Sequence, residues 1–226
     1  MKKRIGLIIM LIVMLVALTG CAQVNYEVEV HKDGSGDITY IYGVSKDKIG
    51  NATDIVEQFV ETMKEQAEDG GYTVELYEND EISGFKANKY VENLSKDFSL
   101  EEAFGEEYVK DTENNKINIE NNFWTTKYSQ NTELDLTNLS DTNVEMTYKI
   151  KLPTKVKTSN ASVVSENEKE LTWNLKSGEI NKVEFVAEEI NALPIIIIVV
   201  VAIAIVAVVI IIILKKKHAT KKENNI

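Results

Sequence analysis

The chain has 226 residues, with 25 basic and 36 acidic residues and a formal net charge of −11. Two segments, residues 1–20 and 193–214, are almost wholly apolar. Three bases lie at the start of the first segment, and five bases and one acid follow the second. The region between the two segments keeps 17 bases and 35 acids, a net charge near −18. Such a surface repels phosphate backbones and excludes nucleic acid as a partner. Beyond Cys21 at its start, the region has no Cys, no Arg and a single His, which excludes disulfide scaffolds, thiol catalysis and Cys/His zinc cages. We therefore expect no cofactor.

Residues 1–20 have the pattern of a bacterial lipoprotein signal peptide. Basic residues at positions 2–4 precede the apolar run Leu7–Leu18. The following Leu18-Thr-Gly-Cys21 resembles a lipobox, in which the cysteine is acylated and becomes the new N-terminus. Cys21 is the only cysteine of the chain, and we predict it as the lipidation site. The alternative is an uncleaved N-terminal membrane anchor.

The next segments predict a β-hairpin followed by a helix. Val24–Val30 and Asp37–Val44 alternate apolar and polar residues, and the glycine-containing turn Asp33–Gly36 joins them. A calcium loop at this turn is disfavoured because the spacing and closing Glu are missing. His31, beside the turn, is expected to be an exposed imidazole. Asn51–Asp69 changes to helical spacing and predicts an amphipathic helix of about five turns that packs on a sheet.

The rest of the region predicts strands and one short helix. Ser99 is the expected N-cap of the helix Ser99–Phe104. The strand-like segments are Tyr72–Tyr77, Phe85–Val91, Lys116–Leu136 (two strands), Val144–Leu152, Leu171–Leu175 and Val183–Ala187. The fold class is therefore α+β: a largely antiparallel sheet, one main amphipathic helix, a short second helix and a C-terminal transmembrane helix. The first and last strands are expected to run in opposite directions relative to the membrane, which would allow them to pair in the sheet.

Residues 193–214 are apolar and long enough to cross a bilayer, at about 1.5 Å per helical residue. The lysine-rich residues 215–226 follow, and the positive-inside rule predicts a cytoplasmic tail. Residues 21–192 are then an extracytoplasmic domain, anchored in the cytoplasmic membrane by an acyl group at one end and a helix at the other.

No catalytic or phosphate-binding motif is present, and the clusters of glutamates lie at positions expected to face solvent. Six aromatic residues are expected to point inward, where they form core or, for some of them, line an apolar pocket between sheet and helix: Tyr26, Tyr40, Tyr42, Trp124, Tyr148 and Trp173.

Several segments together resemble the LppM-like lipoproteins of actinobacteria and Gram-positive bacteria. They are the lipobox, the strand Val24–Val30, the turn Asp33–Gly36, and the stretch from Leu152-Pro153 through Ser159-Asn160-Ala161 to Leu171-Thr-Trp173. The resemblance implies the double-anchor plan, an extracytoplasmic α+β domain similar to lipid-binding folds, and binding of envelope lipids or lipoglycans. It implies structural roles for Asn160 and Trp173 and brings no catalytic residue.

The expected function is that of a non-enzymatic, membrane-anchored lipoprotein whose outward-facing domain binds an envelope amphiphile or a partner at the membrane surface. Two alternatives stay open: an assembly module of a membrane protein complex, and a carboxylate-dependent hydrolase of envelope glycans. An apolar cavity would favour the first function, an exposed apolar patch the second, and two close carboxylates in a cleft the third.

Overall fold

The computed structural model describes residues 22–49, 61, 64–65, 67–110, 115–140 and 144–223. The predicted signal peptide, Cys21 and most of the predicted helix Asn51–Asp69 lie outside these residues. Within that helix, residues 61, 64–65 and 67–69 are described and are helical.

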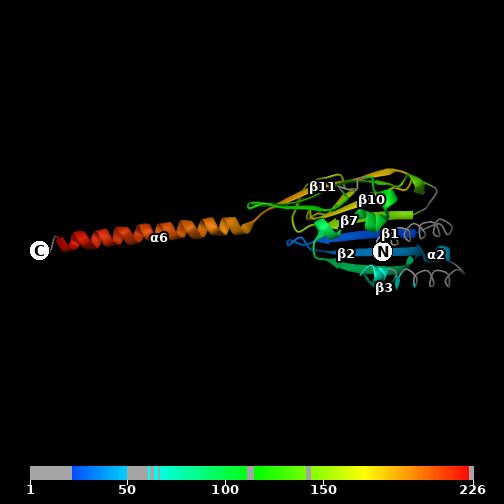
Figure 1. Ribbon diagram of the computed structural model, residues 1–226, viewed down its shortest axis with the longest axis horizontal. Helices are drawn as coiled ribbons and strands as arrows, with labels where there is room; N and C mark the ends of the chain where they lie inside the picture. Colours follow the sequence, from blue (N-terminus) through cyan, green and yellow to red (C-terminus); the bar gives the residue numbers. More distant parts are fainter. Residues whose placement is uncertain are drawn as a thin grey trace. The chain divides into compact units, whose positions relative to one another are not determined.

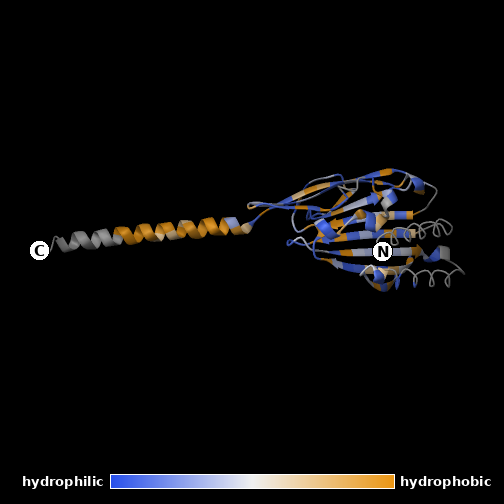
Figure 2. Cartoon of the chain, in the orientation of Figure 1, coloured by the Kyte–Doolittle hydropathy of each residue, from blue (hydrophilic) through white to orange (hydrophobic). Residues whose placement is uncertain are grey.

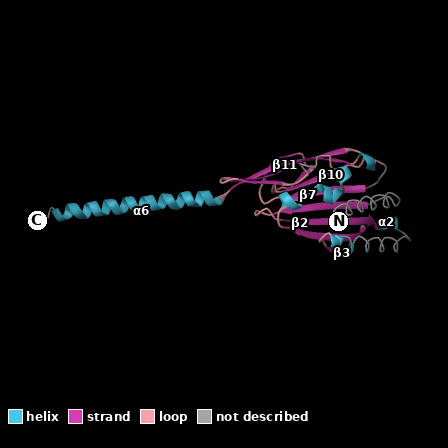
Figure 3. Ribbon diagram, viewed as in Figure 1, coloured by secondary structure: helices cyan, strands magenta, loops and turns pink. Residues whose placement is uncertain are grey.

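Most of the described chain between the predicted anchors is β-strand (Figure 3), which confirms an α+β fold rich in antiparallel sheet. The larger sheet, sheet A, has the order β3-β4-β2-β1-β7-β10-β9. Its strands are β1 (Ala22–Val30), β2 (Gly36–Ser45), β3 (Thr73–Glu78), β4 (Ile82–Val91), β7 (Val144–Lys151), β9 (Val163–Val164) and β10 (Glu170–Leu175).

The smaller sheet, sheet B, has the order β5-β6-β11-β8. Its strands are β5 (Asn118–Asn121), β6 (Thr125–Asp135), β8 (Val156–Ser159) and β11 (Ile180–Ile190). The described helices are α2 (Lys46–Ile49), α4 (Leu94–Asp97), α5 (Leu100–Phe104) and α6 (Ala192–Glu223), with 3-10 turns at Glu106–Tyr108 and Thr137–Leu139. As predicted, Ser99 caps α5, and its Oγ accepts a hydrogen bond from the Glu101 N–H.

The predicted pairing of the first and last strands is wrong. β1 is a central strand of sheet A, antiparallel to β2 on one side and parallel to β7 on the other (Figure 1). With both edges of β1 occupied, the last strand, β11, pairs with β6 and β8 in sheet B.

The chain forms two compact units. Met1–Glu120 and Lys127–Glu188 make up the first, which we call the sheet unit, and Asn121–Thr126 and Glu189–Ile226 the second, which we call the helix unit.

The core of the sheet unit covers one face of sheet A. Alternate residues of β1 are buried there, beginning with Ala22, Val24 and Tyr26. Side chains of α4, α5 and their flanks and of sheet B pack against this face: Leu94, Phe98, Leu100, Phe104, Tyr128 and Phe185. Each such buried side chain contributes about 1.5–3 kcal/mol relative to exposure, so this face supplies much of the stability.

The start of β1 and Ala187 of β11 lie at opposite ends of the sheet unit. Ala22 pairs with Val144 at the start of β7, and the Val144 carbonyl accepts a hydrogen bond from Ser177 Oγ, just before β11 begins. At the other end of β7, Ala187 of β11 pairs with Val156, whose N–H donates to the Glu168 carbonyl in the segment beside that end. The eight residues of β7 lie between, roughly 26 Å at about 3.3 Å per residue.

In the helix unit, α6 carries an unbroken apolar stretch, Ala192–Ile213 (Figure 2). These 22 residues are long and apolar enough to cross a membrane, and all of them except Pro194 are exposed. The helix continues through the lysine-rich segment to Glu223.

Candidate functional site

Five of the six aromatics predicted to point inward, all except Trp124, are buried inside the sheet unit, where they contact one another or neighbouring rings. Tyr26 is central: its ring centroid lies 6.2 Å from Tyr40, 6.0 Å from Tyr148 and 5.7 Å from Phe104. Tyr148 stacks on Trp173 at 5.7 Å. All five belong to the hydrophobic core of the sheet unit.

Tyr42 also belongs to this core, with its ring 5.7 Å from Phe85. Burial raises the pKa values of Tyr26, Tyr40, Tyr42 and Tyr148 above their ordinary value, so these hydroxyls stay protonated. The Tyr148 hydroxyl donates to Gln130 Oε1 at 3.0 Å.

Trp124 departs from the prediction of an inward-pointing ring. It lies in the turn between β5 and β6, with 51% of its surface exposed, beside Phe123 at 62%. The inward positions of β6 are held by Thr126, Tyr128, Gln130, Thr132 and Leu134, three of them polar. Because these buried positions are polar, β6 lacks the apolar–polar alternation from which the position of the turn could be predicted.

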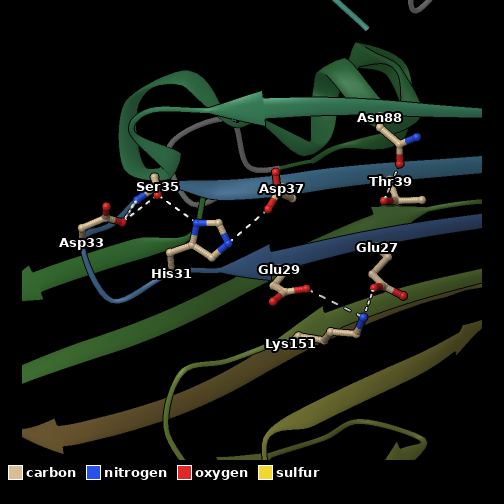
Figure 4. A network of polar contacts seen from close by, with 9 residues as sticks. All are labelled: Glu27, Glu29, His31, Asp33, Ser35, Asp37, Thr39, Asn88 and Lys151. Atoms are coloured by element: carbon tan, nitrogen blue, oxygen red, sulfur yellow. Dashed lines mark hydrogen bonds and ion pairs between the residues drawn. The ribbon is translucent and has the colours of Figure 1, made fainter. Parts of the chain in front are cut away.

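His31 is also placed differently from the prediction of an isolated exposed imidazole. Its Nδ1 lies 3.0 Å from Ser35 Oγ and its Nε2 3.1 Å from the Asp37 carboxylate (Figure 4). Asp33 accepts hydrogen bonds from the Ser35 N–H and hydroxyl, at 3.0 and 2.6 Å. These carboxylates close the hairpin turn through hydrogen bonds, as expected of an ordinary turn.

The face of sheet A opposite the core carries a ladder of ion pairs. Lys151 lies 2.5 Å from Glu27 and 3.9 Å from Glu29, and Lys149 bridges Glu27 and Glu170 at 3.6 and 3.0 Å. The first two contacts are drawn in Figure 4. A small hollow of about 260 Å³ lies on the same face, beside Asn25, Thr39, Thr147 and Lys149. Because its charges are paired across strands, this face has the character of a solvated, stabilising surface.

A second hollow, of about 530 Å³, opens on the sheet unit beside β6 and β11. Its lining comes from four segments that are distant in sequence and is dominated by hydroxyl, amide and charged side chains. The polar lining residues are Ser95, Lys116, Asn118, Lys127, Ser129, Gln130, Asn131 and Glu184. We call it the polar hollow. Sequence reasoning missed it, because no local motif joins residues 95, 116–118, 127–131 and 184.

Three carboxylates have lowered pKa values, the opposite of what a general acid requires. Asp135 has a pKa of about 2, because it accepts hydrogen bonds from Thr137 and Lys110. Hydrogen bonds from lysine likewise lower the pKa values of Glu78 and Glu168. A glycosidase acid has a raised pKa, so none of these three carboxylates fits that role. No group of three or more potential metal ligands occurs within the described part of the chain.

A further arrangement not foreseen from the sequence surrounds Asn191, one residue before α6. Its N–H donates to the Trp124 carbonyl at 2.8 Å, and its Nδ2 donates to the Asn122 carbonyl at 2.7 Å. Thr126 Oγ1 donates to Asn191 Oδ1 at 2.9 Å. These bonds tie the β5–β6 turn to the start of α6, within the helix unit.

Comparison with known proteins places the chain in a family. A search of the curated proteins finds no significant match. Among solved structures, the chain is similar to the folded domain of the Mycobacterium tuberculosis LppM protein, determined by NMR, with 14% identity, a TM-score of 0.48, and coverage of 76% of this chain and 92% of that one. The LppM domain family matches residues 23–189, almost the whole segment between the two predicted anchors. The chain therefore belongs to the LppM domain family.

Proposed function

We propose that this protein is a non-enzymatic lipoprotein of the cytoplasmic membrane whose outward-facing sheet unit binds the headgroup of an envelope amphiphile. In this proposal residues 1–20 are removed, an acyl group on Cys21 and the helix 193–214 anchor the chain, and the tail 215–226 is cytoplasmic. Membership of the LppM domain family and the apolar, unburied stretch of α6 support this arrangement.

The observation that carries the binding proposal is the polar hollow. Its amide and hydroxyl side chains suit hydroxyl-rich groups, and Lys116 and Lys127 suit an anionic substituent. Lys116 Nζ is oriented by a hydrogen bond to the Lys96 carbonyl at 3.1 Å. An acyl chain has no counterpart in this polar lining, so the proposal assigns the headgroup to the hollow and leaves the acyl chains in the bilayer.

Within the sheet unit, Ala22 and Ala187 lie near opposite ends of β7, and in this proposal an anchor follows on the chain from each of these two points. A domain held at both ends by one membrane lies along that membrane rather than standing on it. This arrangement raises the effective concentration of membrane-borne headgroups at the domain surface.

Native mass spectrometry of the full chain, released from nanodiscs containing lipids of the host membrane, tests the proposal. We expect an adduct of one lipid class, lost in Lys127→Glu and kept in Lys155→Glu. Lys155 is an exposed lysine outside the hollow, so this control makes the same change of charge. The absence of any lipid adduct, or equal loss in both variants, would contradict headgroup binding at this hollow.

The second candidate, an assembly module, is supported by β3. This strand is an edge of sheet A, and its Leu76 is 80% exposed. Exposed edge strands with apolar side chains pair readily with other chains. Crosslinking of the full chain in membranes from a Leu76→Cys variant tests this candidate, which predicts one discrete heterologous product.

A further inference from the structure

The turn between β5 and β6 presents two large aromatic side chains to solvent. The rings of Phe123 and Trp124 pack edge to face, with centroids 5.1 Å apart and planes at 86°. In the same unit, Ile190 is 70% exposed and Leu193 67%. We call these four residues the aromatic turn patch. Exposed apolar groups gathered in this way mark interaction surfaces.

The segments that carry the patch have no charged side chain. Residues 121–126 read Asn-Asn-Phe-Trp-Thr-Thr, and residues 190–193 read Ile-Asn-Ala-Leu. Entry of these ten residues into a medium of lower polarity therefore moves no charge out of water, and the flanking charges, Glu120, Lys127 and Glu189, lie just outside them.

Four backbone polar groups of the turn are already paired. The carbonyls of Asn122, Phe123 and Trp124 accept hydrogen bonds from Asn191, at 2.7, 3.5 and 2.8 Å. The Asn122 N–H donates to the Thr125 carbonyl at 2.8 Å. A non-helical segment tolerates the membrane boundary better when its backbone groups are satisfied within the protein, and three carbonyls and one N–H of this turn are satisfied in this way.

The position of Asn191 identifies the occupant. It directly precedes α6, so its hydrogen bonds hold the aromatic turn patch at the level where the apolar stretch begins. Tryptophan favours the headgroup layer, because its ring is apolar and its N–H is polar.

We propose that the aromatic turn patch lies in the interfacial layer of the lipid leaflet that α6 enters, with Asn191 coupling the turn to the helix. This inference rests on the membrane span in the proposed function. The patch then gives the helix a second contact with the same leaflet and fixes the depth at which the chain leaves the bilayer.

Tryptophan fluorescence of the full chain in phosphatidylglycerol–phosphatidylethanolamine liposomes tests the proposal. Trp124 and Trp173 are the only tryptophans, and Trp173 is 3% exposed, so Trp124→Phe leaves a buried reference. We expect lipids brominated near the headgroup to quench the wild type and to leave Trp124→Phe unaffected, and aqueous iodide to quench both weakly.

The outcomes separate the two proposals. If alkaline carbonate strips the chain from the liposomes, the membrane span fails. If the chain resists carbonate but iodide quenches Trp124 and brominated lipid does not, the interfacial position is wrong and the span stands. Shielding of Trp124 from both quenchers would overturn the proposal in favour of burial against a second copy of the chain.

A second variant pair keeps Trp124 as the fluorophore and changes either its neighbour in the patch or a distant exposed residue. Phe123→Ser should increase iodide quenching of Trp124, whereas Leu76→Ser, at an exposed apolar residue of β3, should leave it unchanged. An equal response of both variants would also overturn the proposal.

Discussion

The indole N–H of Trp173 donates a 2.8 Å hydrogen bond to Asn160 Oδ1 and thereby links the two sheets. Trp173 belongs to β10 of sheet A. Asn160 follows β8 of sheet B, and its Oδ1 also accepts from the Glu184 N–H at 2.9 Å, while its Nδ2 donates to the Lys182 carbonyl at 2.9 Å. One exposed amide side chain thus satisfies a buried indole and fixes the path of β11.

Replacing Asn160 by Ala should lower the free energy of unfolding by about 1–3 kcal/mol, because the Trp173 N–H is left without its acceptor. Urea unfolding of the full chain in detergent, followed by near-ultraviolet circular dichroism, measures this change. Asn174→Ala, on the exposed side of β10, is the control and should change stability by less than about 0.5 kcal/mol. A double-mutant cycle with Trp173→Phe should show coupling, and additive effects would mean that the hydrogen bond contributes nothing.

Loss of the hydroxyl group should change the stability of the protein differently at two buried tyrosines, Tyr148 and Tyr40. Tyr148→Phe removes the donor to Gln130 and should cost about 1–2 kcal/mol. The Tyr40 hydroxyl is buried without a hydrogen-bond partner among the described residues, so Tyr40→Phe should be neutral or stabilising. Thermal unfolding of both variants makes the comparison. A larger loss for Tyr40→Phe would show that its hydroxyl has a partner outside the described residues.

Asp135 should make the sheet unit sensitive to acid. Its pKa falls from 3.8 to about 2 in the folded state, so the unfolded chain takes up this proton first as the pH drops. The stabilisation is therefore complete above pH 3.8 and is lost as the pH falls toward 2. In unfolding measured from pH 5 to pH 2, Asp135→Asn should lose less stability than the wild type. Parallel profiles for the two proteins would refute this role.

Loss of the acyl group should release one end of the sheet unit. We expect Cys21→Ala to stay in the membrane through α6, because a spanning helix anchors permanently whereas one acyl chain binds reversibly. A fluorophore on Lys176→Cys, near the start of β11, should be quenched by headgroup-labelled lipids only when Cys21 is acylated. A fluorophore on Lys157→Cys, which replaces the ion-pair partner of Glu188 near the end of β11, is the control and should be quenched with or without acylation. Equal quenching of the Lys176→Cys label in both backgrounds would contradict a domain lying along the membrane.

The sequence predicts elements of this fold better than their arrangement. Alternation in β1 and β2 is clear because their buried positions are apolar, and the hairpin follows directly. The parallel pairing of β1 with β7 produces no comparable sequence pattern, because it depends on which strands compete for the free edge of β1. The prediction that Trp124 points inward fails for a related reason. Gln130 and Thr132 of β6 are buried although they are polar, so the buried positions of this strand cannot be recognised from hydrophobicity. The polar hollow depends on tertiary convergence, which no local pattern encodes.

The pairing of Ala22 with Val144 has a consequence for how the protein is made. The first strand is synthesised early, but its second neighbour is 122 residues away, and sheet A closes only after β7 has left the ribosome. Until then the hairpin β1–β2 has one unpaired edge on the side that β7 will occupy. Such non-local closure is slow, on a scale of milliseconds to seconds. The nascent chain therefore presents an open, adhesive strand for most of its synthesis, and we expect factors that bind nascent chains to engage it there.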